Sequence, residues 1–182
     1  MTKRQVKSTV PKHLRDEWRT PPELFELLDR EFNFYGDAAA TSENNLCNRF
    51  LSPIMKDALS CDWVGQGGKQ TWFLNPPFSQ AAAFLAKANE EAKKGATVVC
   101  LVRGGAPETK WWRDAVLTGM YEYSPESATI YRPKHEIRYL TPRVQYLLPE
   151  WEGEGGNTDF PSALIIMRPK SVYDKVRWWR WK

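Results

Sequence analysis

The stretch from residue 71 to residue 102 constrains the fold more than any other part of the chain. It reads TWFLNPPFSQAAAFLAKANEEAKKGATVVCLV: a short hydrophobic run, a double proline, a helical pattern closed by Gly95, and an unbroken apolar run. Strand, helix and strand at this spacing predict a right-handed βαβ unit within a parallel sheet. The sequence therefore indicates the α/β class.

The first hydrophobic run of this unit stops at NPPF, residues 75–78. Pro76 and Pro77 can neither donate to a sheet nor continue a helix, so the chain must leave its strand in a fixed, extended shape. In parallel sheets, ligands bind beyond the carboxyl ends of the strands, which is where this segment falls. Two interpretations follow: a rigid part of a ligand site, or a simple turn with Phe78 in the core.

Other segments predict the elements around this unit. In TPPELFELLDREF, Thr20 stands three residues before Glu23 and Pro21 follows it, which is typical of a capped amphipathic helix. FNFYGDAAA indicates a strand that ends near Asp37. Among the later segments, ETKWWRDAVL predicts a short helix, and IRYLTPRVQYLL and SALIIMR predict strands. EWEGEGGNTD predicts a flexible connection between these strands.

The chain of 182 residues suits one domain. Residues 1–15 are basic and without hydrophobic period, and we expect a flexible arm there that could touch phosphates, followed by a single domain over residues 16–182. We find neither a signal peptide in MTKRQVKSTV nor an apolar stretch of the roughly 20 residues that span a bilayer. We therefore expect a cytoplasmic protein that does not contact a membrane.

Cysteine and histidine usage argues against metal chemistry. The three cysteines, at positions 47, 61 and 100, are widely spaced and form no CxxC pair, and the chain has only two histidines, His13 and His135. This pattern predicts no disulfide framework and no metal site. The formal charge of +4 fits a polyanionic partner without requiring one.

Five segments in order carry a resemblance to a known family. They are EWRTPPELFELLDREF, DAAATSENN, DALSCDW, LNPPFS and VVCLV, and they resemble the small phage-type DNA N6-adenine methyltransferases. NPPF is similar to the (D/N/S)PP(Y/F) motif of S-adenosylmethionine-dependent amino-methyltransferases. The resemblance covers residues 17–103 well, and RYLTPRVQYL and PSALIIM more loosely. It implies a Rossmann-like methyltransferase fold: a mostly parallel seven-stranded sheet, with an antiparallel strand near one end and helices on both faces.

The resemblance also implies roles for individual residues. The catalytic segment would be Asn75, Pro76, Pro77 and Phe78: the Asn75 side-chain oxygen and the Pro76 carbonyl would accept the two amine hydrogens of adenine, and Phe78 would stack on the flipped base. S-adenosylmethionine would be bound by residues from the family's cofactor segments, namely Trp18, Thr20, Pro21, Asp37, Ala38 with its neighbours Ala39 and Ala40, Asn44 or Glu43, and Asp57. The glycine-rich FxGxG loop of larger methyltransferases is absent, since only Gly36 stands before Asp37.

Alternatives to the catalytic roles are ordinary structural ones. Thr20 could simply cap the helix, and the acids at 37, 43 and 57 could be solvated loop residues. Other NPPY or NPPF enzymes methylate cytosine N4, RNA guanine N2 or protein glutamine, and the motif alone does not separate these substrates. A non-enzymatic DNA-binding protein that kept the fold is a further alternative.

The expected partner is double-stranded DNA with a flipped adenine, in a bacterial host cell, with a phage or prophage origin. RWWRWK at 177–182 and KWWRD at 110–114 combine cations with indoles, a composition suited to phosphates and bases. For each segment the alternative is packing on the core; Val172, Val176 and Trp179 stand at helical spacing. Arg143 matches an arginine on a late family strand, with a salt bridge as its alternative.

Overall fold

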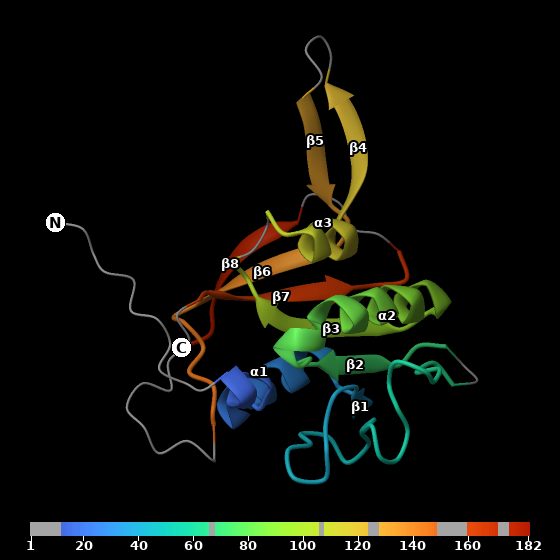
Figure 1. The fold of residues 1–182 in the computed structure, drawn as a ribbon, viewed down its shortest axis with the longest axis vertical. Coiled ribbons are helices and arrows are strands. Elements are labelled where there is room, and N and C mark those ends of the chain that lie inside the picture. The colour runs from blue at the N-terminus through green and yellow to red at the C-terminus, as the bar shows by residue number, and fades with distance from the viewer. Residues whose placement is uncertain (1–11, 66–67, 106–107, 124–127, 149–159, 171–174) are drawn as a thin grey trace, which may run out of the picture.

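The fold centres on a six-stranded sheet with helices on both sides (Figure 1). This computed structural model describes residues 12–65, 68–105, 108–123, 128–148, 160–170 and 175–182. Along the sheet the strands are β1 (Gly36–Asp37), β2 (Thr71–Leu74), β3 (Thr97–Arg103), β7 (Ser162–Met167), β6 (Glu136–Thr141) and β8 (Val176–Arg180). The helices are η1 (Lys12–Asp16), α1 (Pro22–Phe32), η2 (Phe78–Gln80), α2 (Ala81–Lys94) and α3 (Lys110–Val116).

Two further strands form a sheet of their own. β4 (Leu117–Tyr123) and β5 (Ala128–Pro133) pair antiparallel, and Figure 1 shows this pair projecting away from the body of the protein beyond α3.

The predicted βαβ unit is confirmed. β2 and β3 pair in parallel, from Thr71 opposite Thr97 to Leu74 opposite Cys100, with α2 between them in sequence. β1 pairs in parallel with β2, which places Asp37 opposite Phe73. Because these strands run the same way, the end of β1 and the NPPF segment after β2 lie at one edge of the sheet.

The expected seven-stranded sheet is wrong, since the main sheet has six strands in the described part of the chain. Between β1 and β2 the chain forms turns, bends and isolated bridges, such as Ser52 with Lys56, instead of further long strands. Three strand pairs are parallel and two are antiparallel, because β7 runs against both of its neighbours. β7 is third from the β8 edge.

Alternating side chains of the central strands supply two separate hydrophobic cores. Trp72, Leu74, Val98 and Cys100 face the core beneath α2 and α3. Their neighbours in the chain, among them Phe73, face the core beneath α1. This alternation follows from the two-residue period of a strand, and it explains why the central runs are apolar throughout. Helices on both faces are thus confirmed.

Two predictions near the chain ends are wrong. α1 begins at Pro22 with Pro21 as its N-cap, and no side chain caps it, so Thr20 is not the capping residue. At the C-terminus the helical spacing predicts a helix, but the structure has the edge strand β8, which pairs in parallel with β6 from Val176 to Arg180. The backbone hydrogen bonds of this pairing outweigh the weak helical preference of the segment. Val172 and the expected flexible connection over 150–159 lie outside the described residues.

Candidate functional site

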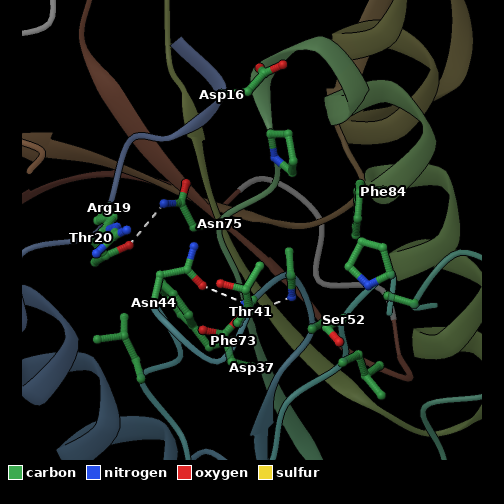
Figure 2. A pocket seen from close by; sticks show the side chains of 18 of the residues that line it. Asp16, Arg19, Thr20, Asp37, Thr41, Asn44, Ser52, Phe73, Asn75 and Phe84 are labelled. Carbon is green, nitrogen blue, oxygen red and sulfur yellow. Dashed lines mark hydrogen bonds between the residues drawn. The ribbon is translucent and has the colours of Figure 1, made fainter. Parts of the chain in front are cut away.

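A cavity opens at the sheet edge where β1 and β2 end. Its empty volume, which includes the open solvent at its mouth, is about 830 Å³. Figure 2 shows side chains from the chain before α1, from the loop after β1 and from the end of β2 converging on it. The predicted residues that line it are Trp18, Thr20, Asp37, Ala38, Ala39, Ala40, Asn44, Asp57, Asn75 and Pro77.

Asp37 ends β1 and is 3 % exposed. Burial raises the pKa of Asp37 to about 6. Backbone hydrogen bonds from Ala39 and Leu46 lower this pKa and so offset part of the effect of burial. Ala39 donates its backbone N–H to Asp37 Oδ1 at 3.1 Å. The small side chains of Ala38 to Ala40 keep the backbone of this turn accessible from the cavity. A buried carboxylate beside an open backbone turn is suited to accept hydrogen bonds from a polar ligand.

Residues 16–20, which we call the N-terminal strap, form the opposite wall. Arg19 and Leu147 exchange backbone hydrogen bonds of 2.8 and 2.9 Å, which ties the strap to the chain after β6. Asp16 accepts two hydrogen bonds from Ser79, one from the backbone N–H at 2.9 Å and one from the hydroxyl at 2.6 Å. The strap is therefore attached on both sides of the cavity.

The strap also brings unsatisfied donors to the site. Within the described residues, Trp18 Nε1 and Arg19 Nε are buried without a hydrogen-bond partner, and both residues line the cavity. Arg19 Nη1 donates weakly to the Glu43 carbonyl at 3.4 Å. These two atoms are shielded from the open cavity, but Arg19 as a residue adds a positive charge to the cavity lining, which is suited to a ligand with an anionic group.

Asn75 follows β2 directly. Its side-chain Nδ2 donates to the Trp18 carbonyl at 3.0 Å and to Thr20 Oγ1 at 3.1 Å. Figure 2 shows the nitrogen turned toward Thr20 and the oxygen turned away from it. The two hydrogens of this amide are thus engaged by the strap, and among the hydrogen bonds of the described residues Oδ1 has no donor.

NPPF separates this cavity from a second one. Pro76 and Phe78 line the second cavity together with Arg103 and Trp111, and its empty volume is about 750 Å³. Phe78 is half-buried, and its ring centroid lies 5.2 Å from that of Phe160 in an edge-on arrangement. Phe78 therefore packs against neighbouring rings and also borders the second cavity.

Two predicted residues lie away from the cavity lining. Pro21 is the N-cap of α1, and its carbonyl accepts from the backbone N–H groups of Leu24 and Phe25. Glu43 is exposed and accepts from the Ser42 hydroxyl, whereas Asn44 lines the cavity and accepts from the Thr41 backbone N–H at 2.7 Å. Of the alternatives Asn44 and Glu43, only Asn44 lines the cavity.

Arg19 and Asp16 line the cavity but were not predicted from the sequence. For Arg19 the available signal was its position in EWRTPP, between the predicted site residues Trp18 and Thr20; Asp16 stands just before this segment. Their contacts to Leu147 and Ser79 join segments more than sixty residues apart, and no local pattern encodes such contacts.

The tryptophan-rich segments divide between surface and core. Trp178 on the edge strand β8 is 76 % exposed, whereas Trp181 is buried and donates its Nε1–H to the Pro142 carbonyl at 2.8 Å. In α3, Trp112 is buried in the core and Trp111 is half-buried at the second cavity. Arg143 is exposed.

All three cysteines are free in the structure. Over the part of the chain that the structure describes, no group of three or more His, Cys, Asp or Glu side chains is arranged to hold a metal ion. In the same residues, no helix has the length and apolar character to cross a bilayer.

Comparison with known proteins gives two matches. The model of the family described as DNA N-6-adenine-methyltransferase (Dam) matches residues 7–176. A curated relative, the DNA N-6-adenine-methyltransferase of Escherichia phage T1, is 34% identical over 116 residues, which are 62% of this chain and 46% of that protein. The chain therefore spans about half the length of this relative.

Proposed function

The chain belongs to the DNA N-6-adenine-methyltransferase (Dam) family, and we propose that it methylates the N6 amine of adenine in DNA with S-adenosylmethionine, on a Rossmann-like fold. The observation that carries this proposal is the Asn75 amide. Its two hydrogens are engaged by the Trp18 carbonyl and Thr20, which leaves its oxygen as an acceptor, and Asn75 lines the first cavity while the next residue, Pro76, lines the second.

The first cavity would bind S-adenosylmethionine. The ligand's carboxylate would meet the positive charge of Arg19, and its hydroxyls would donate to Asp37. Asn44 and the exposed Asp57 offer further polar contacts to the ribose and the adenine amine. When bound, S-adenosylmethionine supplies an electrophilic methyl group on a sulfonium.

The protein's own residues act on the target amine. This amine is a poor nucleophile because its lone pair is delocalised into the ring, so the nitrogen must be drawn toward tetrahedral geometry. The Asn75 oxygen and the Pro76 carbonyl would accept its two hydrogens, and the double proline holds both acceptors where positive charge develops. The amine would form its bond to the methyl carbon as the carbon–sulfur bond breaks and leaves a neutral thioether. One proton would afterwards pass from the amine to water, since Asn75 is neutral and provides no strong base.

A base within a duplex cannot reach such a site, so the target adenine must be flipped out. The second cavity, bordered by Pro76, Phe78 and Trp111, would receive it. Arg103 at the same cavity would favour a phosphate or a ring edge nearby.

A transfer assay with tritium-labelled methyl donor on DNA, RNA and protein tests the function. We expect label in DNA with the wild-type chain and at least about 100-fold less with Asn75→Ala, the scale of a lost transition-state hydrogen bond. Label in RNA or protein but not DNA, or full activity of a folded Asn75→Ala variant, would overturn the proposal.

A further inference from the structure

The Asn75 side chain has one orientation that its surroundings permit. A carbonyl oxygen can only accept, so the Trp18 carbonyl, 3.0 Å away, requires the amide nitrogen to face it. Turning the amide by half a rotation would place Oδ1 against that carbonyl and would break the hydrogen bond to it, whereas the Thr20 hydroxyl could then donate to Oδ1. The same rotation would present N–H groups, instead of an acceptor, to a target amine.

Thr20 supplies the second contact that anchors the amide, whose orientation the Trp18 carbonyl selects. Its Oγ1 accepts from Asn75 Nδ2 at 3.1 Å, and the residue is 4 % exposed. Since α1 is capped at Pro21 without any side chain, the Thr20 hydroxyl is not used for capping. The backbone exchange between Arg19 and Leu147 holds the strap on which Thr20 lies.

We propose that Thr20 is a positioning residue, whose hydroxyl holds the Asn75 amide with its oxygen toward the target amine. This inference rests on the proposed function, because it concerns how Asn75 meets its substrate. Without the hydroxyl, Asn75 retains only its bond to the Trp18 carbonyl, and its amide samples orientations in which the oxygen is misplaced.

The test compares Thr20→Val, which keeps the shape and removes the hydroxyl, with Thr20→Ser, which keeps the hydroxyl. We expect Thr20→Val to lower kcat by about five- to tenfold, the size of one neutral hydrogen bond, with the calorimetric affinity for S-adenosylmethionine within about twofold of wild type. Thr20→Ser should restore most of kcat. Thr20→Val added to Asn75→Ala should cost nothing further, because Thr20 acts through Asn75.

A second readout does not depend on turnover. The side-chain amide resonances of Asn75, assigned by their loss in Asn75→Ala, should shift and broaden in Thr20→Val and stay near the wild-type positions in Thr20→Ser. If Thr20→Val does not fold, the same measurements are made on Thr20→Ala.

Different outcomes separate the two proposals. Wild-type kcat and unchanged Asn75 resonances in a folded Thr20→Val variant, with Asn75→Ala inactive, would overturn the role of Thr20 alone. A loss of cofactor affinity with kcat unchanged at saturation would make Thr20 a cofactor contact instead. Full activity of Asn75→Ala would overturn the proposed function itself.

Discussion

Replacing Asp37 by asparagine should make the protein more stable and less able to bind its cofactor. In the folded protein burial raises the pKa of Asp37 from 3.8 to about 6. One pKa unit is worth about 1.4 kcal/mol, so the buried charge costs about 3 kcal/mol at high pH. An asparagine at this position would keep an oxygen for the Ala39 N–H and would carry no charge.

The sign of the pH dependence follows from proton binding. Between pH 3.8 and about 6 the folded protein holds a proton on Asp37 that the unfolded chain has lost, so stability falls as the pH rises through this window. The gain in free energy of unfolding from Asp37→Asn should therefore be about 3 kcal/mol at pH 8 and only about 1 kcal/mol at pH 4.5.

Urea denaturation followed by tryptophan fluorescence at the two pH values measures this gain. The matched control is Asp57→Asn, because Asp57 lines the same cavity but is exposed, and we expect a change within about 0.5 kcal/mol. A stability equal to wild type at pH 8, or a gain that does not vary with pH, would refute the account of Asp37 as a desolvated charge.

The same substitution, Asp37→Asn, should lower the affinity for S-adenosylmethionine although it raises stability. Hydrogen bonds to a charged acceptor are worth about 1.5–3 kcal/mol, so Asp37→Asn should weaken S-adenosylmethionine binding by roughly 10- to 100-fold in calorimetry at pH 8. The wild-type affinity should itself fall as the pH drops below about 6, where Asp37 gains its proton. Unchanged affinity in the stabilised variant would remove Asp37 from the cofactor site.

Three further substitutions have defined outcomes. Arg19→Gln should weaken S-adenosylmethionine binding about tenfold or more in calorimetry, and equal affinity would exclude Arg19 from contact with the ligand's carboxylate. Phe78→Ala should raise the KM for DNA, since stacking is worth about 1–3 kcal/mol per base, with cofactor affinity near normal; a variant that fails to fold would favour a core role. Glu91→Gln should lower the free energy of unfolding by about 3 kcal/mol at pH 7, because buried Glu91 accepts from Lys87 and Lys94 at 2.8 and 2.9 Å, and a neutral variant of equal stability would contradict this.

Much of the sheet could be predicted because its signals are local. Continuous apolar runs such as 97–102, the double proline at 76–77 and the helix closed by Gly95 are fixed by side-chain period and backbone chemistry. The same reasoning put Asp37 and Asn75 each at the end of a strand. The parallel pairing of β1 and β2 then brings both to one cavity.

The wrong predictions depend on contacts that sequence spacing does not contain. Thr20 precedes Glu23 at a capping spacing, yet its hydroxyl meets Asn75, 55 residues away. Val176 and Trp179 stand at helical spacing, yet the edge of β6 offers residues 176–180 backbone hydrogen-bond partners. The resulting strand β8 is exposed at most of its positions. In both places tertiary contacts override a local preference of about 1 kcal/mol or less.

Nucleoside mass spectrometry tests the central claim most directly. The wild-type chain is incubated with S-adenosylmethionine and unmethylated duplex DNA, which is then digested to nucleosides, with Asn75→Ala as the control. We predict N6-methyl-2′-deoxyadenosine in the DNA treated with the wild-type chain, and an amount of this nucleoside at least about 100-fold lower with the variant. Methylcytosine in its place, or no methylated nucleoside from a folded protein that binds the cofactor, would contradict the assignment of adenine N6 as the target.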